Sequence, residues 1–337
     1  MWKCAPALAA GNTFIFKPSE VTPLTAYILA EVLTEAGLPP GVFNLVHGAG
    51  NVGSLLCSDR RVAKVSFTGQ PSTGIAVYTS VAKTLKPITL ELGGKSPFIV
   101  FPDADLESAV NSCLTANYYS SGQVCTNGTR VFLHKDIFDA FSELLVKKVK
   151  ECVRPGDPLH KDVNFGPVVS KQHYDKVVSY IHHGMYVDNA TLMLGGPTKP
   201  STLAEPFDVG YFVRPTIFTD CRDDMKIVRE EIFGPVACLL SFETTDEVIQ
   251  RANDTELGLA AGVFTKDLNT ANRVMAEVQA GICWVNTWGE SPPQMPVGGW
   301  GYSGVGFENG VEALSQFVKN KSVLVENGEA APAFEQL

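Results

Sequence analysis

Patterns typical of strands and of helices alternate along residues 13–92 of the chain. The strand patterns are short runs rich in β-branched and aromatic residues, at 13–16, 42–46, 62–67 and 88–92. Helix patterns lie between them at 23–37, 52–57 and 73–84. The first has Pro23 in its first turn and Gly37 at its end, as helices commonly do. Such alternation predicts a parallel sheet with helices on its faces.

A second α/β unit is expected after Gly93-Gly94, where two glycines break the pattern. Its expected strands are 97–101, 237–242 and 282–286, and its expected helices are 105–118, 136–153, 245–252 and 268–278. The last part of the chain carries a helix pattern at 310–318 and a strand pattern at 322–326. A length of 337 residues exceeds one ordinary core, which also favours two domains.

The composition excludes two classes of protein. The net charge is −9 and the chain has no lysine or arginine run, whereas a nucleic-acid surface needs a concentrated basic patch. No apolar stretch is long enough to span a bilayer, and Pro6 interrupts the only run that resembles a signal peptide. The eight cysteines contain no CxxC pair and are typical of reduced thiols. We therefore expect a cytoplasmic protein.

Two glycine-rich turns are candidate phosphate sites. Residues 48–53 form a GxGxxG pattern between a strand and a helix, but the acidic residue expected about twenty positions later is missing. An ordinary strand–helix turn explains this pattern equally well. The second turn runs from Phe67 through Thr68 and Gly69 to Gly74, and its N–H groups could hold a phosphate at a helix N-terminus.

Lys17-Pro18-Ser19-Glu20 follows the first strand. Open α/β sheets bind ligands at the carboxyl ends of their strands, so Lys17 and Glu20 could bind ribose hydroxyls there. A polar loop with a helix cap is the alternative.

Glu91 lies at the end of an apolar strand pattern. A carboxylate buried there is costly unless it is paired or functional, and desolvation would raise its pKa into the range of a general base. A structural ion pair is the alternative.

Cys125 differs from the other cysteines in its neighbours. It lies among small polar residues, with Gly122 and Gly128 on its two sides. These surroundings favour an accessible thiol that can lose its proton and act as a nucleophile, rather than a packed one. No histidine lies nearby in the sequence, so nothing supports a Cys–His hydrolase.

Together these motifs resemble the aldehyde dehydrogenase superfamily, across essentially all 337 residues. They occur in the family's order: residues 17–20, 67–69, 91–95, 122–125 and 230–236. Segments 123–130 and 286–292 look most like bacterial betaine aldehyde dehydrogenases. The resemblance implies an α/β fold with a partial Rossmann-type cofactor domain at 1–92 and a catalytic domain at 93–302. Residues 303–337 would then carry a helix that returns to the cofactor domain and an oligomerisation strand.

The resemblance also implies roles for individual residues. Cys125 would attack an aldehyde to give a thiohemiacetal, hydride transfer would leave a thioester, and Glu91 would activate the water that hydrolyses it. The implied cofactor is NAD, with NADP possible, because a carboxylate at Glu20 repels a 2′-phosphate. No metal site is implied. The cofactor-binding positions are Lys17, Ser19, Glu20, Phe67, Thr68, Gly69, Gly74, Leu92, Gly93, Glu231 and Phe233.

Three aromatic residues match positions that line the family's substrate tunnel: Trp2, Tyr119 and Trp288. Aromatic faces suit a quaternary ammonium, which cannot donate hydrogen bonds. We therefore expect oxidation of betaine aldehyde to glycine betaine. Ordinary core aromatics are the alternative.

The sequence departs from the family in three places. The family's chain extends well upstream of Met1, and that part holds the asparagine whose amide completes the oxyanion hole. We therefore expect a truncated reading frame, with a homodimer or homotetramer only if the upstream segment is present. Gly301 and Phe307 replace a usual lysine and arginine, which puts any monovalent-cation site in doubt.

Two further hypotheses for the whole chain remain. One is a catalytically impaired remnant that binds nucleotide or a full-length partner. The other is a cysteine hydrolase or acyltransferase that uses Cys125.

Overall fold

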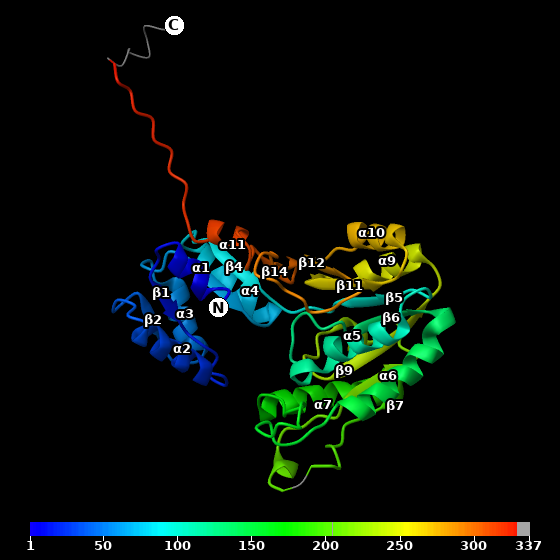
Figure 1. The fold of residues 1–337 in the computed structure, drawn as a ribbon. Coiled ribbons are helices and arrows are strands. Elements are labelled where there is room, and N and C mark those ends of the chain that lie inside the picture. Colours follow the sequence, from blue (N-terminus) through cyan, green and yellow to red (C-terminus); the bar gives the residue numbers. More distant parts are fainter. Residues whose placement is uncertain (204, 329–337) are drawn as a thin grey trace.

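The first part of the chain folds into short strands and helices, as the computed structural model shows for residues 1–203 and 205–328 (Figure 1). Its elements are α1 (Cys4–Ala9), β1 (Phe14–Phe16), α2 (Leu24–Glu35), β2 (Phe43–Leu45), α3 (Gly50–Ser58), β3 (Val65–Thr68), α4 (Pro71–Ala82) and β4 (Ile88–Glu91). The expected parallel sheet is divided into two small sheets. One pairs β1 with β2 and the other pairs β3 with β4, both in parallel.

A seven-stranded sheet forms the second part, in the order β12-β11-β5-β6-β9-β8-β7. Its strands are β5 (Pro97–Val100), β6 (Arg130–His134), β7 (Thr191–Leu194), β8 (Thr216–Thr219), β9 (Val236–Phe242), β11 (Ala260–Phe264) and β12 (Ile282–Val285). Every neighbouring pair is parallel except β7 with β8. The strands are nearly continuous apolar runs, as parallel strands buried on both faces require.

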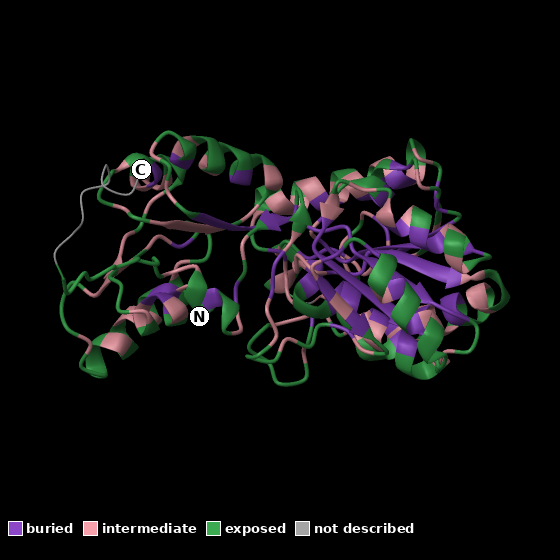
Figure 2. Ribbon diagram, turned by 90° about the horizontal axis from the view of Figure 1, so that it is seen from above, coloured by how far each residue is buried: buried purple, intermediate pink, exposed green. Residues whose placement is uncertain are grey.

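Helices cover both faces of this sheet. α5 (Leu106–Tyr118) and α6 (Phe138–Cys152) pack on one face, and α7 (Lys171–Tyr186), α9 (Thr245–Asn253) and α10 (Leu268–Glu277) pack on the other. Helix α5 begins directly after a capping residue: the Asp105 side chain accepts a hydrogen bond from the Ser108 N–H. The core therefore lies in the second part of the chain. Figure 2 shows buried residues concentrated there, whereas the part with the N-terminus is mostly exposed or intermediate.

The chain returns to the first part near its end. β13 (Trp300–Gly301) pairs with β10 (Leu257–Gly258), and β14 (Gly304–Val305) then pairs antiparallel with β4. The remaining short helices are α8 (Lys226–Arg229), α11 (Glu312–Ser315) and three 3₁₀ segments at Tyr119–Gly122, Lys135–Ile137 and Phe207–Val209. Strand β4 therefore lies between β3 and β14, which are far apart in the sequence.

The last expected elements are corrected by the structure. The helix predicted at 310–318 is only the four-residue α11, and residues 322–326 form no strand. A strand needs a second strand to complete its hydrogen bonds, and none pairs with this segment in the described part of the chain. Figure 1 shows it leading away from the fold. None of the described helices is long and apolar enough to cross a membrane.

Candidate active site

The link between the two parts of the chain, Glu91 to Gly94, is held by hydrogen bonds from three segments. The Gly69 N–H donates to the Glu91 carbonyl at 3.1 Å, and the Leu92 N–H donates to the Ser303 carbonyl at 2.8 Å. The Ser303 hydroxyl donates to the Gly93 carbonyl at 2.7 Å and accepts from the Gly258 N–H at 2.9 Å. The backbone on either side of Glu91 is therefore fixed.

The Glu91 side chain is buried, with 6% of its surface exposed. Its Oε1 atom has no hydrogen-bond partner among the described residues. The pKa of Glu91 is raised to about 8, mainly by burial and also by the negative charge of Glu308, while the positive charge of Lys3 acts in the opposite direction. A carboxyl group with this pKa can take up a proton near neutral pH, as a general base must.

Lys3 and Glu308 form an ion pair beside Glu91. Both side chains contact the Ser66 hydroxyl, which accepts from the Lys3 ammonium at 3.0 Å and donates to Glu308 Oε1 at 3.2 Å. Sequence reasoning missed this pair, because its members lie 305 positions apart and neither belongs to a recognised motif. The pair sets part of the charge that Glu91 experiences.

Cys125 follows an unusual backbone segment. Ser120, Ser121 and Gly122 have φ values of +51°, +56° and +75°, so three consecutive residues lie in the left-handed region. A Cβ at Gly122 would collide with the backbone of Gly234, so this tight turn packs directly on the segment after Phe233. The Asn127 amide donates to the Gly122 carbonyl at 2.9 Å and closes the loop around the cysteine.

Glu91 and Cys125 belong to segments in direct contact. A Cβ at Gly94 would collide with the carbonyl oxygen of Cys125, so only glycine allows the approach. The Cys125 residue as a whole is intermediate between buried and exposed. The structure thus brings together the two residues singled out as nucleophile and base.

The expectation that the Cys125 thiol readily loses its proton is not met by its surroundings. Burial and the charges of Glu231 and Glu91 raise its pKa to about 11, and only the N–H groups of Cys125 and Thr126 lower it. Among the described residues, no cation is one of the main causes of this pKa. Formation of the thiolate therefore needs a proton acceptor.

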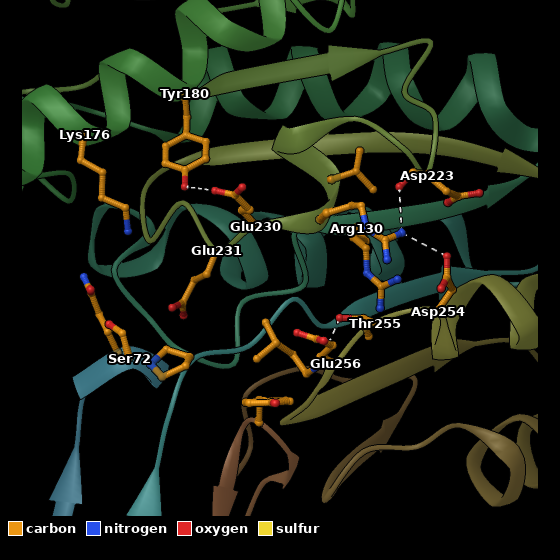
Figure 3. Close-up of a pocket in the computed structure, with 16 residues that line it drawn as sticks. Ser72, Arg130, Lys176, Tyr180, Asp223, Glu230, Glu231, Asp254, Thr255 and Glu256 are labelled. Atoms are coloured by element: carbon orange, nitrogen blue, oxygen red, sulfur yellow. Dashed lines mark hydrogen bonds and ion pairs between the residues drawn. The ribbon is translucent and has the colours of Figure 1, made fainter. Parts of the chain in front are cut away.

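A cavity of 620 Å³ lies beside this contact (Figure 3). Its walls include the N-terminal residues of α4, Pro71 and Ser72, and across from them Glu231, Lys176 and Tyr180. Helix N-termini attract phosphate groups. The walls thus combine a helix N-terminus with several charged side chains: Lys176, Arg130, Arg229, Asp223, Glu230, Glu231, Asp254 and Glu256.

The Glu231 carboxylate accepts a hydrogen bond from the Gly94 N–H at 3.2 Å and occupies the space where a Gly93 side chain would lie. Burial raises its pKa, whereas that N–H group and the charges of Lys176 and Lys95 lower it. Lys176 was not identified from sequence, because its helix α7 carries no recognised motif.

The remaining predicted cofactor positions are mostly packed against each other. The Phe67 ring lies over Gly69, and the Leu92 side chain fills the space beside Gly74. Thr68 is exposed. Phe233 has a φ of +59°, and its carbonyl contacts His173 Nε2 at 2.6 Å.

In the loop after β1, the Lys17 side chain is held by two hydrogen bonds. The Lys17 ammonium donates to the carbonyls of Pro18 at 2.6 Å and Gly48 at 2.8 Å, while Ser19 and Glu20 are exposed. Lys17 thus reaches the GxGxxG segment. There the Val52 side chain packs on Gly48, in a turn that leads into α3.

The three predicted substrate aromatics lie in different surroundings. Trp288 is buried, with ring centroids 4.9 Å from Trp284 and 5.2 Å from Phe98. Tyr119 is 69% exposed. Trp2 lines a second cavity of 380 Å³ with Phe14, Phe16, Leu29 and Glu308 among others. No described cavity contains all three rings. Within the described residues, no group of three or more His, Cys, Asp or Glu side chains could hold a metal ion.

Comparisons with known proteins agree with these features. Residues 1–323 match the aldehyde dehydrogenase family. A double mutant of betaine aldehyde dehydrogenase from Staphylococcus aureus, solved in complex with NAD+, is 39% identical with a TM-score of 0.94, and the match covers 99% of this chain and 66% of that one. An NAD-dependent aldehyde dehydrogenase from Sinorhizobium meliloti is also 39% identical, with a TM-score of 0.94, over 98% of this chain and 65% of that one.

A mutant aldehyde dehydrogenase from Bacillus cereus is 42% identical, with a TM-score of 0.91, over 96% of this chain and 64% of that one. The chain therefore spans slightly less than two thirds of the length of the structures it matches.

Proposed function

Since the chain belongs to the aldehyde dehydrogenase family, we propose that it supplies the catalytic residues of an NAD-dependent enzyme that oxidises an aldehyde to a carboxylic acid. The observation that carries the proposal is the contact of the Glu91 segment with the Cys125 carbonyl through Gly94. This contact supports a single site for the buried Glu91 carboxyl group, whose Oε1 atom has no partner among the described residues, and the Cys125 thiol.

Cys125 forms the covalent bond to substrate. Its sulfur adds to the aldehyde carbon to give a thiohemiacetal, and loss of hydride leaves a thioester. The N–H groups of Cys125 and Thr126, which lower the pKa of the thiol, are placed to stabilise negative charge at the sulfur. Glu91 takes the proton from the water that hydrolyses the thioester.

The part of the cavity of 620 Å³ between α4 and Glu231 is the proposed place for part of the NAD. The N-terminus of α4 suits the pyrophosphate, and Glu231 with Lys176 suits ribose hydroxyls. When bound, this cofactor accepts the hydride. Leu92 and Gly93, between Glu91 and Gly94, are further proposed cofactor contacts, and so is Phe233, which lies in the segment that packs on Gly122. Lys17, Ser19 and Glu20 would bind the adenosine ribose, and the carboxylate at Glu20 favours NAD over NADP.

Betaine aldehyde is the proposed substrate. Support comes from the Staphylococcus aureus relative and from the motifs around Cys125 and Trp288. The proposed role of Trp2, Tyr119 and Trp288 is to present aromatic faces to the trimethylammonium group. Because the three rings lie apart here, this role requires the segments around Trp2 and Tyr119 to face the substrate in the working enzyme.

We also propose that the chain is divided into domains at 1–92, 93–302 and 303–337. The enzyme would assemble as a homo-oligomer and work in the cytoplasm.

The test is the appearance of the reduced nicotinamide, followed by absorbance, when NAD and betaine aldehyde are added to the chain. Turnover of betaine aldehyde above that of a neutral aliphatic aldehyde of similar size is expected. Equal efficiency for both aldehydes would overturn the substrate assignment. Nucleotide binding without any turnover would instead identify a catalytically impaired remnant.

A further inference from the structure

One histidine that no motif singled out, His173, contacts the segment that carries Glu231 and Phe233. It lies in the first turn of α7, where its N–H donates to the Ser170 hydroxyl at 3.2 Å. Its Nε2 atom lies 2.6 Å from the Phe233 carbonyl oxygen, which can only accept, so Nε2 carries a proton and donates this hydrogen bond. The two rings also meet edge to face, with centroids 5.7 Å apart and planes at 70°. His173 therefore holds both the backbone and the ring of Phe233.

Phe233 needs such support because of its backbone conformation. Its φ of +59° lies in the left-handed region, which is rare and costly for a residue with a bulky side chain. A conformation of this kind persists only where the surrounding structure fixes it, and it is a reason to look for a function. Two side chains one turn apart on α7 meet the turn: His173 bonds the Phe233 carbonyl, and Val177 fills the space where a Cβ of Gly234 would lie.

The chain just before α7 is fixed to the loop that carries the candidate nucleophile. The Ser121 hydroxyl donates to the Gly166 carbonyl at 2.7 Å, and the Val169 N–H donates to the Gln123 side chain at 2.9 Å. The beginning of α7 is thus anchored to that loop, and His173 extends from it to the cofactor segment. The hydrogen bond of His173 therefore relates the position of one segment to that of the other.

We propose that His173 is a positioning residue for the cofactor. Its hydrogen bond keeps Phe233 in the left-handed conformation, and so keeps the Phe233 ring and the Glu231 carboxylate where NAD binds. This inference rests on the proposed function, in which both residues contact NAD. Glu231 lines the cavity of 620 Å³ and His173 does not, so His173 acts through the segment that it holds.

Two substitutions separate the hydrogen bond from the packing. H173F keeps an aromatic ring beside Phe233 but lacks the donor, whereas H173Q keeps an N–H donor at the end of a side chain of similar length. The matched control is H182F. His182 is exposed on the same helix, and among the described contacts its ring makes no hydrogen bond and only stacks on Tyr186. Thermal unfolding establishes that each variant is folded.

Hydrogen exchange of the cofactor-free protein tests the support of the segment directly. Peptides that cover residues 230–236 should exchange faster in H173F than in the parent protein, and at the parent rate in H173Q and H182F. Equal exchange in H173F and the parent would overturn the proposal. Exchange in H173Q as fast as in H173F would also overturn it, because the hydrogen bond would then have no part in holding the segment.

Calorimetric titration with NAD tests the consequence for the cofactor. Loss of one hydrogen bond should raise the Kd for NAD by about threefold to tenfold in H173F, while H173Q and H182F should bind as the parent does. An unchanged Kd in H173F would overturn the role in cofactor binding. If the parent itself does not bind NAD, the proposed function fails and the cofactor role of His173 fails with it, whereas the exchange measurement still decides whether His173 holds Phe233.

Discussion

The Gly94 N–H group donates a hydrogen bond of 3.2 Å to the Glu231 carboxylate. Glu231 lines the large cavity, and Gly94 also packs against the Cys125 carbonyl. One glycine therefore joins the wall of the cavity, the candidate nucleophile and the strand that carries Glu91. A substitution of Gly94 should therefore affect every function proposed for the site.

Replacement of Gly94 by alanine tests this arrangement. The new Cβ would collide with the Cys125 carbonyl and press on Leu259 and Ser96. Overpacking of this kind costs about 1–3 kcal/mol, and displacement of the Cys125 backbone should reduce turnover by at least about tenfold. Activity and thermal unfolding measure the two effects. G50A is the control, since Gly50 has no atom within 4 Å of an added Cβ; equal behaviour of the two variants would contradict the argument.

Lys3 and Glu308 should shift the pKa of Glu91 in opposite directions. The negative charge of Glu308 raises that pKa and the positive charge of Lys3 lowers it. E308Q should therefore move the acidic limb of the pH–rate profile to lower pH, and K3M should move it to higher pH. Thioester hydrolysis followed across a pH series measures the shift. Movement of both profiles in the same direction would show that the pair acts through structure rather than charge.

Stability should depend on pH through Glu91. Its pKa in the folded protein is about 8, against an ordinary value of 4.5 for a glutamate, so the folded state binds the extra proton between these values. The free energy of unfolding should fall as pH rises from about 4.5 to about 8. E91Q removes the titrating group and should be more stable than the parent above pH 8, by a margin that disappears near pH 4. Thermal unfolding at the two pH values gives the comparison. A constant difference between parent and variant would contradict it.

Much of the fold could be predicted because local chemistry and burial agree. The periodic segments with capping residues became helices close to their expected bounds, as α9 behind Thr244 and α10 behind Asp267 show. The resemblance to the aldehyde dehydrogenases and the α/β fold are confirmed by the family match and the solved structures. Helix α7 was missed although Ser170 caps it and Val177 and Ile181 are buried one turn apart.

The rest depended on contacts between distant segments. Residues 322–326 read as a strand from β-propensity alone, but a strand forms only beside a partner. Glu91 and Cys125 were identified from their own neighbours, whereas the Lys3–Glu308 pair exists only after β14 returns to β4. The raised pKa of Cys125 could not be predicted from the sequence either, because it arises from burial of the thiol in the folded chain and from the charges of Glu231 and Glu91.

The central claim is that Cys125 carries the substrate as a thioester that Glu91 helps to hydrolyse. The most direct test incubates the E91Q variant with NAD and betaine aldehyde, quenches it in acid, and maps the peptides by mass. Acylation of the peptide that contains Cys125 is predicted, with faster loss of the adduct in the parent protein. An adduct on another cysteine, or none on a variant that still binds NAD, would contradict the claim.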